Sequence, residues 1–156
     1  MEHPILFSQE SIQAILAGRK TETRRVYTGE YGFQAAWSKT GNPILDFGPT
    51  RGFKEVKCPY GTGGDLLWVR EPWERDGKRK PALFMPKRNA RIWLKIRTVS
   101  ISTLGNMNPY DAYAEGYKTL DAYREAWNSL NKKRGYPWRK GQPVWVIQFE
   151  IKRIAR

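Results

Sequence analysis

The segment Gly18–Arg25 holds the residue types and spacing best suited to chemistry. Four cations lie within seven residues: Arg19, Lys20, Arg24 and Arg25. Cations that lie close together lower the pKa of a lysine among them, and only a neutral lysine can act as a base or a nucleophile. Thr21 and Thr23 supply hydroxyl groups, and Arg25 could bind an anion through two hydrogen bonds. A solvated basic surface would have the same composition, so both interpretations stay open.

Acidic residues gather farther along the chain, where Glu71, Glu74 and Asp76 follow an apolar stretch. Carboxylates grouped in this way can bind Mg²⁺. Basic residues are interspersed with them: Arg70, Arg75, Lys78 and Arg79. We therefore expect ion pairs in this region and predict no metal site.

Trp138 follows a basic run at Lys132–Arg134 and could stack on an unpaired base. The turn at Pro137 could equally direct the Trp138 side chain into the core. Further candidates for contacts to nucleic acid are Arg70, Lys87 and Arg88.

The composition of this chain of 156 residues limits the classes of function. One histidine (His3) and one cysteine (Cys58) exclude an internal disulfide and the usual zinc sites. A histidine-based catalytic triad would have to use His3, next to the N-terminus, so we predict none. Lys and Arg outnumber Asp and Glu by 28 to 15, which gives a net charge of +13 and predicts a polyanionic partner. No apolar run is long enough to span a membrane, and the N-terminus lacks a signal sequence, so we expect a cytoplasmic protein without cofactors.

The first half of the chain predicts a strand at Ile5–Phe7 and then a helix that Ser8 caps and Gly18 ends. Residues 19–27 form a turn and an extended segment. Glycine and proline punctuate residues 28–64, which predicts a long excursion with a small hairpin near 44–47. A strand follows at 66–70, then an exposed loop at 74–81 and a short strand at 83–85.

The second half carries the strongest strand pattern, at residues 91–104. Its apolar alternation slips by one residue before Val99, which predicts a bulge or a bend. Asn108 and Pro109 begin a helix that ends at Gly116, and another helix begins near Thr119. The second helix is expected to bury Tyr123, Ala126, Trp127 and Leu130. A last strand spans residues 144–151, so the element order predicts an α+β fold with a curled or closed β-structure and short helices at its edges.

Four blocks of sequence resemble the ASCH domain, a relative of the PUA RNA-binding domain. The first is the Gly-x-Lys-x-x-(Glu/Thr)-x-Arg signature, which Gly18, Lys20, Thr23 and Arg25 match. Three further blocks match in order: Gly64–Glu71, Asp111–Tyr117 and Val144–Phe149. The resemblance is strongest to phage and prophage members, and it leaves out two insertions, at about 28–57 and 72–82.

The resemblance implies one PUA-like domain over residues 1–156, with a cleft between a β-barrel and its helices. It also implies an RNA, nucleotide or modified-nucleoside substrate. One branch of the family hydrolyses the amide of N4-acetylcytidine with a lysine, a threonine and a glutamate, which correspond here to Lys20, Thr23 and Glu115. Other members are described as ribonucleases. Glu115 could instead only form a structural ion pair with a nearby arginine.

We therefore expect a hydrolase that works without a metal on a nucleoside amide or on RNA. Lys20, Thr23 and Glu115 would be its catalytic residues. The remaining residues of the basic segment would bind substrate: Gly18, Arg19, Thr21, Arg24 and Arg25. The competing hypothesis is a non-catalytic module that binds RNA or single-stranded nucleic acid in the same cleft, and a phage-associated protein with a protein partner is a third.

Overall fold

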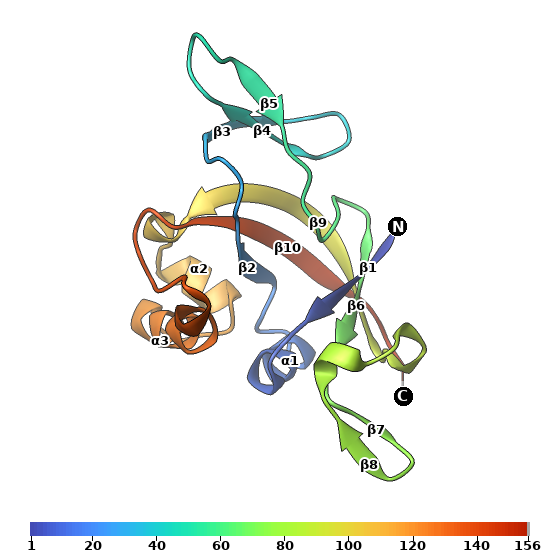
Figure 1. Cartoon of the computed structure of the whole chain (residues 1–156). Helices are drawn as coiled ribbons and strands as arrows, with labels where there is room; N and C mark the ends of the chain where they lie inside the picture. The colour runs from blue at the N-terminus through green and yellow to red at the C-terminus, as the bar shows by residue number, and fades with distance from the viewer. Residues whose placement is uncertain (156) are drawn as a thin grey trace.

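A curved five-stranded sheet forms the centre of the computed structural model, which describes residues 1–155 (Figure 1). Its strands lie in the order β1-β6-β9-β10-β2. β1 and β6 run parallel, and the other neighbours are antiparallel. The bounds of these strands are β1 (Glu2–Leu6), β2 (Glu22–Val26), β6 (Leu66–Arg70), β9 (Ile92–Thr103) and β10 (Pro143–Ile154).

The sheet curls but does not close into a barrel. β1 and β2 are its two edges and are not hydrogen-bonded neighbours. Each has only five residues, and helix α1 (Gln9–Leu16) joins them and buries Ile12 and Ile15 in the central core. The prediction of an α+β fold with a curled sheet and helices at its edges is confirmed, whereas the closed form is not adopted.

The two longest strands, β9 and β10, carry the bend that the sequence predicts. Thr98 pairs with Gln148 and Ile96 pairs with Phe149, so Arg97 is an extra residue in β9. An extra residue of this kind bends its strand and reverses the alternation of faces. The slip of the apolar pattern before Val99 therefore has its cause at Arg97.

Helix α1 begins and ends where the sequence predicts. The Ser8 hydroxyl accepts a hydrogen bond from the Ser11 backbone N–H at 3.2 Å, which satisfies one free donor of the first turn. Gly18 follows the helix with φ +76°, a backbone conformation that residues with a Cβ rarely adopt. The chain then turns directly into the segment that leads to β2.

Two further helices, α2 (Pro109–Ala114) and α3 (Leu120–Asn131), pack on the other face of the sheet. Asn108 and Asp111 form a capping box at the start of α2. Short 3-10 turns flank this pair: η3 (Leu104–Asn106) and η4 (Lys132–Arg134). No helix within residues 1–155 combines the length and apolar character needed to cross a membrane.

The buried side of α3 differs in part from the prediction. Tyr123 and Trp127 are buried, as expected. Ala126 is only half-buried, and Leu130 is 58% exposed. The prediction for Leu130 is wrong because this residue lines a cleft and does not face the sheet.

The glycine-rich residues 28–57 form a small three-stranded sheet of their own, at the upper end of Figure 1. Its strands are β3 (Phe33–Trp37), β4 (Pro43–Asp46) and β5 (Phe53–Glu55), so it contains more than the predicted hairpin. The Trp37 Nε1–H donates to the Val99 carbonyl at 2.7 Å and ties this sheet to β9. Leu45 is fully buried in the central core.

Residues 71–91 form a second projection, which we name the arm. It contains the hairpin β7 (Trp73–Arg75) and β8 (Lys78–Lys80), followed by the 3-10 turns η1 (Ala82–Phe84) and η2 (Lys87–Asn89). The sequence predicts a loop at 74–81 and a strand at 83–85, and both predictions are wrong. Asp76 and Gly77 both have positive φ, and a two-residue turn of this kind joins paired strands into a hairpin.

Candidate functional site

Lys20 is a buried lysine at the centre of the candidate site. It lies between α1 and β2 and is only 4% exposed. Its Nζ donates to the Glu115 Oε1 at 2.7 Å and to the Glu115 carbonyl at 3.2 Å. Both side chains of this ion pair are 3% exposed. The structure therefore joins two of the three predicted catalytic residues by a direct contact across 95 positions of sequence.

Glu115 ends helix α2 and holds two cations at once. Its Oε2 accepts from the Arg24 Nη1 at 3.0 Å, while its Oε1 binds Lys20. The same Arg24 atom contacts the Glu22 Oε1 at 3.1 Å. The Arg24 Nη2 lies 3.6 Å from the Asp111 Oδ1. These contacts confirm the expected ion pairing of Glu115 with an arginine, and they fix the carboxylate in place.

Burial is the main influence on the charges of this cluster. It lowers the pKa of Lys20, although the nearby carboxylate of Glu115 opposes that shift. The sequence attributes this lowering to neighbouring cations, but Arg25 contributes less than burial does. Burial also raises the pKa of Glu22. For Arg24, burial opposes the charge, but the carboxylates of Glu115 and Glu22 outweigh it and raise its pKa.

Thr23 and Arg25 form the second part of the site. Both alternate along β2 with Glu22 and Arg24, so they lie on the opposite face of that strand. Thr23 is 4% exposed, and its Oγ1 accepts a hydrogen bond from the Arg25 Nε at 3.2 Å. The Arg25 guanidinium lies 4.9 Å from the centre of the Phe7 ring. Arg25 is thereby held beside the Thr23 hydroxyl.

One cleft of about 880 Å³ brings these residues together. Lys20, Thr23, Arg24, Arg25 and Glu115 all line it. Aromatic side chains from several elements complete its walls: Phe7, Tyr60, Tyr117, Tyr123, Trp127 and Tyr136. We name it the main cleft. Its mix of aromatic walls and a few converging charges is typical of sites that bind small organic groups.

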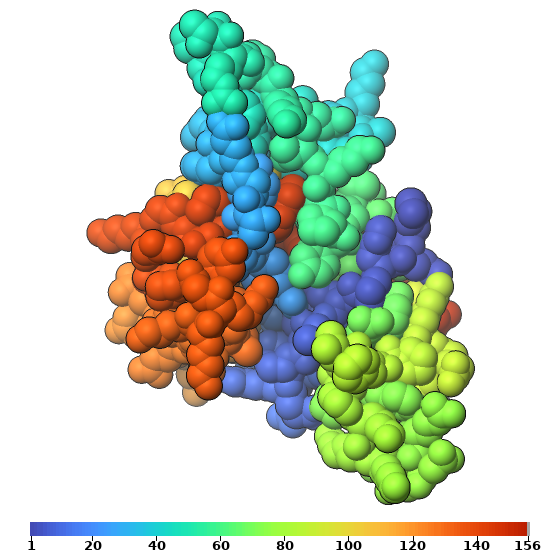
Figure 2. All heavy atoms as spheres, viewed as in Figure 1, coloured from blue at the N-terminus to red at the C-terminus, as the bar shows by residue number. Residues whose placement is uncertain are grey.

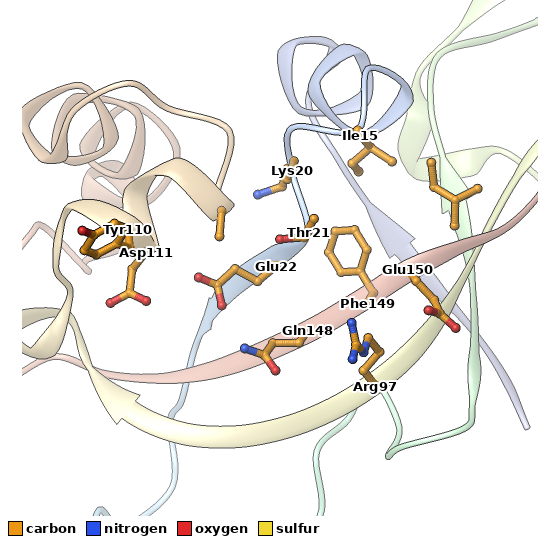
Figure 3. Close-up of a pocket in the computed structure, with 13 residues that line it drawn as sticks. Ile15, Lys20, Thr21, Glu22, Arg97, Tyr110, Asp111, Gln148, Phe149 and Glu150 are labelled. Carbon is orange, nitrogen blue, oxygen red and sulfur yellow. The ribbon is translucent and has the colours of Figure 1, made fainter.

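A second, smaller cleft of about 550 Å³ also reaches Lys20 (Figure 3). Figure 3 shows Lys20 and Glu22 beside Tyr110 and Asp111 of α2, with Gln148 and Arg97 on the sheet below. Gly18 and Thr21 line this cleft and not the main one. Lys20 is therefore part of the wall between the two clefts.

The remaining predicted binding residues are scattered. Arg70 lines the main cleft, and its guanidinium lies 4.9 Å from the centre of a Trp68 ring. Arg19 and Arg88 are exposed, and Lys87 is ion-paired with Glu2. Trp138 is half-buried and packs edge-on against Tyr123, so it belongs to the helix core and lines neither cleft.

Two carboxylates of the buried cluster, Glu22 and Asp111, are absent from the set that the sequence predicts. Glu22 could have been found, because the alternation along a strand places it on the same face as Arg24. The position of Asp111 beside Arg24 depends on packing between α2 and β2, which local sequence does not encode. Tyr117 and Tyr123 line the cleft for the same reason.

Two of the three acidic residues of the arm form ion pairs, and only Asp76 pairs with one of the expected cations; among the residues that the structure describes, no cation lies within 4.0 Å of Glu74. Glu71 accepts two hydrogen bonds from Arg91, at 2.7 and 2.8 Å. Asp76 lies 3.8 Å from the Arg75 guanidinium. Within residues 1–155, no three His, Cys, Asp or Glu side chains are grouped as ligands of one metal ion.

Comparison with known proteins identifies structural relatives only. No family model and no curated protein sequence matches the chain. An ASCH domain from Lactobacillus crispatus JV V101 superposes with a TM-score of 0.52 at 18% identity, over 96% of this chain and 79% of the other. The hypothetical protein PH0355 gives 0.51 at 15% identity, over 97% of this chain and 99% of its own. Protein EF3133 from Enterococcus faecalis V583 gives 0.51 at 17% identity, over 99% and 83%. The chain therefore has the fold of an ASCH domain.

Proposed function

We propose that this protein hydrolyses an amide on a modified nucleoside, free or within RNA, with Lys20, Thr23 and Glu115 as its catalytic residues and without a metal ion. The observation that carries the proposal is the buried contact of 2.7 Å between the Lys20 Nζ and the Glu115 Oε1 in the wall of a cleft that Thr23 also lines. The ASCH-type fold, together with the matching sequence signature, supports a nucleoside as the substrate class.

The contact between Lys20 and Glu115 gives the site a movable proton. Burial lowers the pKa of Lys20, so the proton can pass along this hydrogen bond to the carboxylate. The transfer leaves a neutral amine on Lys20 and a carboxylic acid on Glu115. A base and an acid are then both present in the cleft, as amide hydrolysis requires.

The reaction consumes one water and returns every group to its starting state. The Thr23 Oγ1 attacks the amide carbon while the Lys20 amine takes the hydroxyl proton. The C–N bond then breaks as Glu115 gives its proton to the departing nitrogen. Water attacks the acyl ester on Thr23, which releases the carboxylic acid and restores the hydroxyl. The Arg25 Nε, 3.2 Å from the Oγ1, stabilises negative charge that develops on this oxygen.

The walls of the main cleft suit a nucleobase. Tyr60, Tyr117 and Tyr136 line it together with Trp127, and flat rings of this kind pack well against the faces of bases. Arg24 stays bound to the second oxygen of Glu115 throughout, so that oxygen is not available to the substrate. Only the Oε1 takes part in proton transfer.

Turnover measured by mass spectrometry tests the proposal. The substrates are N4-acylated cytidines and a short single-stranded RNA, and the proteins are the wild type, Lys20→Ala and Lys118→Ala. Lys118 is an exposed lysine near the end of α2 and serves as the matched control. We expect product from the wild type and from Lys118→Ala, and none from Lys20→Ala. Absence of product from all three proteins, at enzyme concentrations close to the substrate concentration, would refute the hydrolase.

A non-catalytic binding module is the second candidate, and one observation favours it. The Lys20 ammonium makes two hydrogen bonds to Glu115, and Arg24 holds the same carboxylate. A recognition pocket with a fixed charge pattern would have this arrangement as well. A pure binder would tolerate Lys20→Arg and Thr23→Val, which a hydrolase would not.

A further inference from the structure

The arm at residues 71–91 contains more cations than its ion pairs neutralise. It contains seven cations and three carboxylates. Arg91 binds Glu71, Lys87 binds Glu2, and Arg75 lies near Asp76. Within residues 1–155, four arm cations have no carboxylate within 4.0 Å: Lys78, Arg79, Lys80 and Arg88. Unpaired cations grouped on a projection attract polyanions.

Three of the four cations of the hairpin lie on one of its faces, and Arg79 lies opposite Glu74 on the other face. In the register of the hairpin, Trp73 is opposite Lys80 and Arg75 is opposite Lys78, so all four residues share a face. The Trp73 Nε1–H donates to the Pro81 carbonyl at 3.1 Å, and its ring packs against the buried Trp68, Met85 and Trp93. The hairpin is therefore anchored to this buried cluster through Trp73 and is not part of an unstructured loop.

The arm begins at the main cleft. Arg70, Pro72 and Ala82 line the cleft, and they belong to the segments on either side of the hairpin. Phe84, two residues after Ala82, is 69% exposed and offers a ring on which an unpaired base can stack. The surface thus combines a route from the cleft, a stacking side chain and unpaired cations.

The opposite side of the cleft is basic as well. Arg134 of η4 lines the cleft, and Lys132 and Lys133 beside it are exposed. Figure 2 shows the arm (yellow-green) and the α3–η4 segment (orange) as separate projections on one face, with the N-terminal residues (blue) between them. The cleft lies in this interval, because Pro4–Gln9 and Ser11 are among its lining residues.

We propose that the arm and η4 bind the phosphates of a single strand of nucleic acid that crosses the mouth of the main cleft. The nucleotide in the cleft is then one unit of a polymer and not a free nucleoside. As a statement about the substrate this inference rests on the proposed function, whereas the binding surface itself is independent of catalysis. The single strand is favoured because Phe84 can stack only on an unpaired base.

Two charge-matched triple variants test the surface. The arm variant is Lys78→Ala, Arg79→Ala and Lys80→Ala. The control variant is Lys39→Ala, Lys54→Ala and Lys57→Ala, which removes three exposed lysines at the other end of the molecule. Binding of labelled single-stranded RNA of about 20 nucleotides is measured by fluorescence anisotropy across a range of salt concentrations. Circular dichroism melts show that both variants fold.

We expect the arm variant to bind this RNA at least about tenfold more weakly and to lose about 2 from the slope of log K against log salt, since each lost phosphate contact removes about 0.7. The control variant keeps wild-type affinity and slope, and Phe84→Ala weakens binding without a change in slope. Equal losses in the two triple variants would overturn the inference. So would tighter binding to duplex RNA or to vesicles of anionic phospholipid than to the single strand.

Failure of this inference is distinguishable from failure of the proposed function. Suppose that the wild-type protein releases no product from N4-acylated cytidine or RNA, but the arm variant shows the expected loss of binding. The binding surface is then supported and the hydrolase is refuted. If the wild type hydrolyses the free nucleoside and neither triple variant changes RNA binding, the hydrolase is supported and the polymer substrate is refuted.

Discussion

Glu115 is the residue on which the buried charges of the site depend. It contacts both Lys20 and Arg24, and all three side chains are less than a tenth exposed. Glu115→Ala leaves two buried cations facing each other without their shared carboxylate. We predict a loss of about 3–5 kcal/mol in the free energy of unfolding, measured by urea denaturation at neutral pH.

Glu125→Ala is the control for that variant, because Glu125 is an exposed glutamate on α3. Its effect on the free energy of unfolding is expected to lie within about 0.5 kcal/mol. An equally small effect of Glu115→Ala would show that the buried cluster is not held together by this carboxylate.

Cys58 makes stability depend on alkaline pH. Burial raises the pKa of its thiol to about 11, from an ordinary value of 9.0. The folded state therefore keeps a proton that the unfolded state loses, so this contribution is complete below pH 9 and is lost as the pH rises toward 11. Cys58→Ala should remove about 3 kcal/mol of this decline, measured as the free energy of unfolding at several pH values. An unchanged pH dependence would contradict the assignment.

Residue types and spacing singled out the segment with Lys20 and Thr23, and the resemblance to the ASCH domain added Glu115; all three residues line one cleft. These signals were insufficient for the carboxylates around Arg24. Glu22 is masked by the cations on both sides of it in sequence, and Asp111 lies 87 positions from Arg24 and meets it only through helix packing. Contacts of that kind depend on the fold and not on local pattern.

At the scale of elements, Gly116 sets how closely α2 approaches the site. Its φ is +95°, and a Cβ there would lie 3.0 Å from the Ala14 Cβ and 3.4 Å from the Lys20 Cβ. Gly135 has nearly the same φ, +94°, but no atom lies within 4 Å of a Cβ there. Both Gly→Ala variants strain the backbone, but only Gly116→Ala also pushes against α1 and Lys20.

We therefore predict that Gly116→Ala lowers the free energy of unfolding by about 1–3 kcal/mol more than Gly135→Ala does. Chemical denaturation of the two variants beside the wild type measures the difference. Equal losses would mean that backbone strain alone acts at both positions, and that contact between α2 and the Lys20 segment is not tight.

Elements with strong local signals were predictable, and elements whose signals conflict were not. The slip of the apolar pattern located the extra residue Arg97 in β9, because a bulge reverses the alternation of faces. The hairpin of the arm was missed although Asp76 and Gly77 form a favoured turn, since the charged residues around them resemble a loop. Leu83–Met85 is apolar but too short to be extended without a partner strand, and it forms part of a 3-10 turn.

At the scale of the whole molecule, the net charge of +13 predicted a polyanionic partner but could not locate its surface. The fold separates these cations into groups that flank the main cleft and groups that lie elsewhere. It also leaves the sheet open, so that α1, β2, α3 and the residues that follow α2 enclose a cleft with aromatic walls. Neither arrangement follows from composition, because both depend on which segments meet in the fold.

Turnover and binding measured in the same variants distinguish a hydrolase from a binding pocket. N4-acetylcytidine is mixed with an excess of wild-type protein, Lys20→Arg or Thr23→Val, and the release of cytidine is followed over time. The dissociation constant of each protein is measured by calorimetry. We expect both variants to react at least about 10²-fold more slowly than the wild type, while the dissociation constant changes less than about fivefold. Turnover by Lys20→Arg at the wild-type rate, or its absence in the wild type with affinity intact, would contradict catalysis by Lys20 and leave a binding pocket.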